Sequence, residues 1–95
     1  MSKIKYRVMA VDDEPNILIS IKTCLPTSIY QVDAFTNITE AYAALKKNVY
    51  DCALIDIRLG HDSGIQLYNN MKLEGIDVLS IFKSGNASLN EAVES

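Results

Sequence analysis

Short apolar runs alternate along this chain with longer stretches that carry apolar residues at helical spacing. The expected strands are residues 7–11, 30–35, 52–57 and 77–82. The third run, CALIDI, is apolar on both faces except at one aspartate, as is typical of strands that helices cover on both sides. Strands and helices that alternate in this way predict an α/β fold with a parallel sheet built from right-handed βαβ units.

Helix signals fill the segments between these runs. Pro15 suits the first turn of a helix, which we expect to end before Pro26. A capping box at residues 37–40 opens a second helix, and a third helix follows Gly64. A further capping box at residues 88–91 predicts a fourth helix, in which the chain is expected to stop.

The length of 95 residues allows one domain, which we expect to span residues 1–95. The net charge is −3 with acids and bases interspersed, so no basic face favours binding to nucleic acid or anionic lipid. No stretch approaches the ~18 apolar residues of a membrane span, and the N-terminus lacks the apolar region of a secretory signal. We therefore expect a cytoplasmic protein in which Cys24 and Cys52 are buried, reduced thiols.

Three aspartates stand where two of the expected strands end. Asp12 and Asp13 follow the first strand directly, and Asp56 lies near the end of the third. In open parallel sheets, ligands bind outside the carboxyl ends of the strands, at a topological switch point. We therefore expect the three carboxylates to share one edge of the sheet.

Such a cluster points to metal-assisted phosphoryl chemistry. Neighbouring carboxylates ~4 Å apart repel by about 4 kcal/mol per pair at an effective dielectric constant near 20, unless a cation or a shared proton relieves them. A sparse set of oxygen ligands favours Mg²⁺ over Ca²⁺, and Asp56 could then act as a nucleophile toward phosphorus. The alternative is that Asp12 or Asp13 caps the first helix. Capping leaves unexplained why Asp56 interrupts an apolar strand, where a lone carboxylate is costly.

The motifs VMAVDDEPN, YDCALIDIRLGHDSG and SIFKSGNASLNEAV, in this order, resemble the receiver domain of two-component response regulators. The resemblance covers all 95 residues. It implies a flavodoxin-like, doubly wound parallel sheet with strand order 2-1-3-4. It also implies that Asp56 accepts a phosphoryl group from a sensor histidine kinase or a phosphotransfer protein. Asp12, Asp13, Asp56 and the backbone carbonyl of Arg58 would hold Mg²⁺, and the Ser84 hydroxyl would turn toward the phosphoryl group.

The sequence departs from this family beyond the fourth strand. Receivers continue through a fifth strand, with a lysine that pairs with the phosphoryl group, and a fifth helix, whereas both are expected to be missing here. Neither Lys72 nor Lys83 matches the position of that lysine, so no residue receives its role. The run at 77–82 would then be an apolar edge strand, which predicts a homodimer through strand four or helix four. The alternative is that the chain is a fragment of a longer polypeptide.

Two other functions compete with phosphoryl acceptance. A degenerate receiver would act as a protein-interaction module without phosphate, because the lysine is lost. A hydrolase of the haloacid dehalogenase type also places an aspartate after strand one, but it needs a D-x-D motif where this chain has DDE. We therefore expect a signalling module rather than an enzyme.

Overall fold

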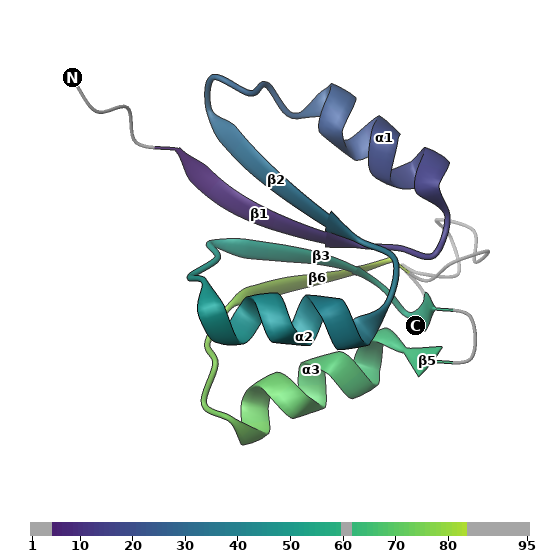
Figure 1. Ribbon diagram of the computed structural model, residues 1–95, viewed down its shortest axis with the longest axis vertical. Coiled ribbons are helices and arrows are strands. Elements are labelled where there is room, and N and C mark those ends of the chain that lie inside the picture. Colours follow the sequence, from purple (N-terminus) through teal and green to yellow (C-terminus); the bar gives the residue numbers. More distant parts are fainter. Residues whose placement is uncertain (1–4, 60–61, 84–95) are drawn as a thin grey trace, which may run out of the picture.

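The computed structural model describes residues 5–59 and 62–83, which form a parallel sheet with helices on both faces (Figure 1). Its strands are β1 (Tyr6–Val11), β2 (Tyr30–Phe35), β3 (Cys52–Asp56) and β6 (Leu79–Lys83). They lie in the order β2-β1-β3-β6, and every neighbouring pair is parallel. The predicted doubly wound sheet and its order are therefore confirmed, with β6 in the place of the fourth strand.

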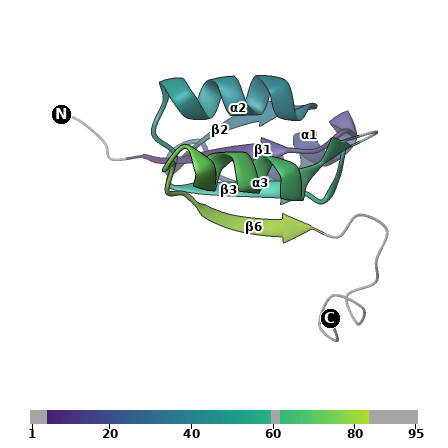
Figure 2. The same cartoon turned by 90° about the horizontal axis from the view of Figure 1, so that it is seen from below.

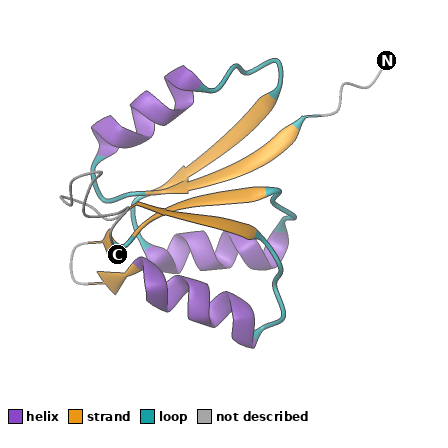
Figure 3. Cartoon of the chain, turned by 180° about the vertical axis from the view of Figure 1, so that it is seen from behind, coloured by secondary structure: helices purple, strands orange, loops and turns teal. Residues whose placement is uncertain are grey.

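Three helices connect these strands: α1 (Pro15–Cys24), α2 (Ile38–Lys47) and α3 (Gly64–Leu73). Figures 1 and 3 show α1 on one side of the strands and α2 and α3 together on the other. The predicted cap of α2 forms, because the side chain of Asn37 accepts a hydrogen bond of 2.8 Å from the Glu40 backbone N–H. None of these helices has the length and apolarity needed to cross a membrane. The helix predicted from residues 88–91 lies outside the described residues.

The main core lies between the sheet and the pair α2 and α3. Because side chains alternate along a strand, Met9 and Val11 of β1 face this core in register with Ala53 and Ile55 of β3. The helices contribute further buried side chains, namely Ile38, Ala41, Leu45, Leu67 and Met71. Full burial of a large apolar side chain stabilises by about 1.5–3 kcal/mol, so this core holds the carboxyl ends of β1 and β3 side by side.

The opposite face of the sheet is covered unevenly. Ala10, Leu54 and Ile81 lie in register across β1, β3 and β6 on this face. α1 packs over β1 and β2, so Ala10 is fully buried whereas Ile81 is 51% exposed. Figure 2 shows β6 at the edge of the sheet, beyond β3. Over the described residues, cover on this face therefore decreases from β1 toward β6.

Three local predictions were wrong. The fourth strand begins at Leu79 and ends at Lys83, two residues later and one residue further than predicted. Residues 58–63, between the third predicted strand and the helix predicted after Gly64, carry no predicted strand, but they contain β4 (Arg58–Leu59) paired antiparallel with β5 (Asp62–Ser63). Cys24 is exposed and Cys52 only partly buried. Cys24 is the last residue of α1 and lines a surface hollow together with Leu54 of β3. The thiol is exposed because α1 does not cover this part of the sheet.

Candidate functional site

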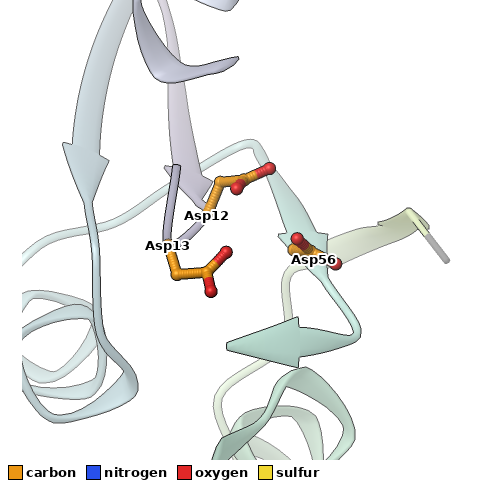
Figure 4. A group of neighbouring side chains, drawn as sticks. All are labelled: Asp12, Asp13 and Asp56. Carbon is orange, nitrogen blue, oxygen red and sulfur yellow. The ribbon is translucent and has the colours of Figure 1, made fainter. Parts of the chain in front are cut away.

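Three carboxylates meet at the carboxyl ends of β1 and β3. Asp12 and Asp13 directly follow β1, and Asp56 is the last residue of β3. Figure 4 shows the side chains of Asp12 and Asp13 extending toward Asp56. One oxygen atom of each carboxylate lies within 4.8 Å of the other two. The structure therefore brings together all three acids that the sequence singled out.

Two of these acids are withdrawn from solvent. Asp12 is 2% exposed and Asp56 is 5% exposed, whereas Asp13 is exposed. Each buried carboxylate accepts one backbone hydrogen bond from the turn that follows it. The Glu14 N–H donates to Asp12 Oδ1 at 2.9 Å, and the Arg58 N–H donates to Asp56 Oδ1 at 3.1 Å. These bonds fix the orientation of both carboxylates.

The alternative that Asp12 or Asp13 caps the first helix is only partly confirmed. The N-cap residue of α1 is Glu14, and its side chain makes no capping hydrogen bond. Asp12 accepts the Glu14 N–H two residues along the chain, which is the geometry of an Asx turn. Asp12 thus orders the turn between β1 and α1, and its side chain still lies at the acid cluster.

The environment of Asp56 disfavours its charge. Burial raises the pKa of the Asp56 carboxyl above its ordinary value, and the negative charges of Asp12 and Asp13 raise it further. The Arg58 N–H and the Lys83 ammonium act in the opposite direction without cancelling the rise. A cation that joins the cluster would therefore stabilise the ionised form of Asp56.

A glycine lets α3 approach this strand. The Gly64 N–H donates to the Ile57 carbonyl at 2.8 Å, at the start of α3. A Cβ atom at position 64 would lie 2.6 Å from Ile55 Cγ2 and even closer to the backbone carbonyl oxygen of Asp56. The sequence marked Gly64 only as the entry to a helix. Its contact with the backbone of Asp56 follows from the fold.

Lys83 is the charged residue that sequence reasoning missed. Its Nζ lies 3.2 Å from Asp12 Oδ2, and it is the register partner of Asp56 in the pairing of β3 with β6. The prediction ended the strand at Phe82, so it did not extend the alternation of Leu79 and Ile81 by one more step. That alternation is the signal that could have placed Lys83 on the face of Asp56.

The remaining predicted site residues are placed less fully. Arg58 lies in β4, where its backbone N–H contacts Asp56. Ser84 lies outside the described residues, so its predicted role stays a prediction.

Residues 8–95 match the response regulator receiver domain family. The chain belongs to this family. Receiver domains are signalling modules that bind Mg²⁺ at an acidic pocket. The cluster of Asp12, Asp13 and Asp56 supplies the oxygen ligands that such a cation prefers.

Known proteins with similar sequences and structures agree with this membership. The chain is 28% identical over 93 residues to the alginate biosynthesis transcriptional regulatory protein AlgB of Pseudomonas aeruginosa. That match covers 98% of this chain and 21% of AlgB, so the chain spans about a fifth of that relative.

Two solved receivers superpose closely on this fold. A CheY-like response regulator receiver domain protein from Methanospirillum hungatei is 30% identical, with a TM-score of 0.73 over 95% of this chain and 72% of that one. The response regulator TrrA of Thermotoga maritima, solved in complex with Mg²⁺ and beryllium fluoride, is 25% identical. Its TM-score is 0.71 over 94% of this chain and 96% of TrrA.

Proposed function

We propose that this chain is a phospho-accepting receiver module of a two-component response regulator. In this proposal the chain is cytoplasmic, and Asp56 takes the phosphoryl group from a phosphohistidine of a sensor histidine kinase or phosphotransfer protein. The observation that carries this proposal is the buried carboxylate of Asp56 at the end of an otherwise apolar strand, beside two further carboxylates. TrrA, a relative of the same fold, supports the proposal because it was solved with Mg²⁺ and a beryllium fluoride.

The proposed transfer uses Asp56 as the nucleophile. A carboxylate oxygen of Asp56 attacks phosphorus and forms the acyl phosphate bond. The bond from phosphorus to the imidazole nitrogen breaks, its electron pair stays on that nitrogen, and the imidazole keeps or takes up a proton. The Arg58 N–H holds the Asp56 carboxylate in a fixed orientation during this attack. In this proposal the hydroxyl of Ser84 then turns toward the phosphoryl oxygens.

Asp12, Asp13, Asp56 and the backbone carbonyl of Arg58 would hold the Mg²⁺. The three carboxylate oxygens within 4.8 Å of one another are a donor set that fits this cation. When bound, Mg²⁺ offsets the negative charge of the phosphoryl oxygens. The chain is an acceptor of the group in this scheme, not an enzyme that turns over a separate substrate.

A homodimer is the second part of this proposal. β6 is the edge strand of the sheet over the described residues, and two of its large apolar side chains, Leu79 and Ile81, are 67% and 51% exposed. An exposed apolar edge can pair with another chain. We propose self-association through β6 or the helix expected after it. Sedimentation showing a folded monomer at high concentration would contradict this part alone.

The central proposal is tested by incubation with Mg²⁺ and acetyl phosphate. We expect the intact mass to rise by one phosphoryl group in the wild-type protein and to stay unchanged in Asp56→Asn. The matched control is Asp77→Asn, which removes the same charge from an exposed residue between α3 and β6 and should still be phosphorylated. If the wild-type protein takes up no phosphoryl group at any donor concentration, the module instead acts by protein interaction without phosphate.

A further inference from the structure

Lys83 reaches across one strand to an acid on the next. β3 lies between β6, which ends at Lys83, and β1, which leads into Asp12. The ion pair of 3.2 Å between Lys83 Nζ and Asp12 Oδ2 therefore crosses the strand that carries Asp56. Because Lys83 and Asp56 are register partners in β6 and β3, their side chains leave the sheet on the same face. The ammonium thus lies on the Asp56 side of the sheet and pairs with Asp12.

The surroundings let this side chain move. Lys83, Asp12 and Asp56 all line a cavity of about 170 Å³, whose wall also includes the apolar side chains of Leu54 and Ile81. The side chain of Lys83 is 48% exposed, whereas that of Asp12 is 3% exposed. A lysine has a flexible stem with three rotatable donors, so its ammonium can exchange one oxygen partner for another.

In the structure, Lys83 stands in the way of a metal at Asp12. Both oxygens of Asp12 already have a partner, since Oδ1 accepts the Glu14 N–H and Oδ2 accepts the Lys83 ammonium. A divalent cation and an ammonium at the same carboxylate oxygen repel each other. Lys83 must therefore leave Asp12, at least in part, before Asp12 can serve as a metal ligand.

We propose that Lys83 is an exchangeable counter-ion of this site. It neutralises Asp12 while the cluster holds no metal, and it leaves Asp12 when Mg²⁺ binds. It then pairs with the phosphoryl oxygens carried by its register partner, Asp56. Charge-assisted hydrogen bonds from an ammonium to such oxygens are strong, which gives the displaced side chain a new partner. This inference rests on the proposed function of Asp56 as the phosphoryl acceptor.

The first measurement is the affinity for Mg²⁺ alone, by calorimetric titration of the wild-type protein and of Lys83→Met. Methionine keeps the apolar stem beside Leu54 and Ile81 and removes the charge. We expect the Mg²⁺ dissociation constant of Lys83→Met to fall by about three- to tenfold, the effect of a half-exposed charge. Lys47→Met is the control. Lys47 is exposed in the last turn of α2, so this substitution removes the same charge far from the three aspartates. Its dissociation constant should match that of the wild type.

The second measurement is the affinity for beryllofluoride, a phosphoryl mimic, at a Mg²⁺ concentration that saturates each variant. Here Lys83→Met should bind about three- to tenfold more weakly than the wild type, because the cation facing the mimic is lost. Lys83→Arg should recover part of this affinity. In Lys83→Met, the affinity for Mg²⁺ should thus rise while the affinity for beryllofluoride falls. A general loss of folding would weaken both.

The outcomes separate this inference from the function on which it rests. The inference is overturned if Lys83→Met binds either ligand as Lys47→Met does, or if it weakens both. In those cases the wild-type protein still binds Mg²⁺ and beryllofluoride, so the proposed acceptor function stands. If the folded wild-type protein binds no beryllofluoride at saturating Mg²⁺, the acceptor function fails and the inference fails with it.

Discussion

Near the amino ends of β1 and β3, Arg7 and Tyr50 donate hydrogen bonds to a single aspartate of β2, whereas at the carboxyl ends of β1 and β3 three aspartates face one another. At the amino end, Asp33 Oδ2 accepts hydrogen bonds from Arg7 Nε at 3.2 Å, from Arg7 Nη2 at 3.1 Å and from the Tyr50 hydroxyl at 2.6 Å. The Arg7 guanidinium also lies 5.1 Å from the centre of the Tyr50 ring. We call these three residues the Arg7–Asp33–Tyr50 cluster.

The two ends balance their charges differently. In the Arg7–Asp33–Tyr50 cluster, burial of Asp33 opposes its charge, but the hydrogen bonds from Tyr50 and Arg7 outweigh burial and lower its pKa. At the acid cluster, burial and neighbouring charges raise the pKa of Asp56. The first arrangement stabilises the fold as it stands. The second leaves negative charge that a ligand can relieve, which is the usual state of a binding site before its ligand arrives.

The largest expected effect concerns α3, whose first residue, Gly64, packs against the backbone of Asp56 and the side chain of Ile55. Gly64→Ala should lower the free energy of unfolding by about 3 kcal/mol, because the added Cβ meets the Asp56 carbonyl and Ile55, and neither is a flexible side-chain end. Urea unfolding measures this value. Gly75→Ala is the control, since Gly75 has a φ of 72° but open space around it, and it should lose only about 1 kcal/mol from backbone strain. Equal losses in the two variants would contradict the close approach at position 64.

The next effect tests the Arg7–Asp33–Tyr50 cluster by alkaline titration. Burial, together with the bond to Asp33, raises the pKa of Tyr50 from 10.0 to about 12. Below pH 10 both folded and unfolded states keep this proton, so the contribution of Tyr50 is complete there. Between pH 10 and 12 only the unfolded state loses the proton, so stability should fall by about 2 kcal/mol over this window. Tyr50→Phe should remove this slope. If stability still falls between pH 10 and 12 in Tyr50→Phe, groups other than Tyr50 cause the fall.

A smaller loss is expected when the charge at the amino end is removed. Asp33→Asn should lower the free energy of unfolding by about 1–2 kcal/mol, because Arg7 and Tyr50 lose a charged acceptor. The wild type should also lose stability as the pH falls below 3.8, since the pKa of Asp33 is lower in the folded state than in the unfolded state. Asp33→Asn should lack the part of this acid transition that comes from Asp33. An unchanged free energy of unfolding at pH 7 would show that the bonds around Asp33 add nothing.

The sequence predicts the two ends of the sheet unequally well. Asp12, Asp13 and Asp56 are marked locally, because each interrupts or ends an apolar run that the strand pattern identifies. The pairing of Asp12 with Lys83 joins residues 71 positions apart and depends on the register of β3 with β6, which no local pattern gives.

The amino end could not be predicted for the same reason. Arg7 and Asp33 are 26 residues apart in sequence and meet only because β1 and β2 pair in parallel with a particular register. The exposure of Cys24 likewise depends on which half of the sheet α1 covers. Element type and the polar interruptions of strands are local properties, whereas contacts between strands are set by tertiary packing.

The smallest expected effect has the opposite sign and separates the two ends most directly. Asp56→Asn makes the same chemical change as Asp33→Asn, but without metal it should raise the free energy of unfolding by about 0.5–1 kcal/mol, because it removes one of three repelling charges. Urea unfolding in a chelator measures this value. Added Mg²⁺ should then stabilise the wild type more than Asp56→Asn, since a ligand stabilises the state that binds it. If Asp56→Asn destabilises the metal-free protein as Asp33→Asn does, then Asp56 is held by its partners in the fold, and the acid cluster does not carry the unrelieved charge on which its role as a binding site depends.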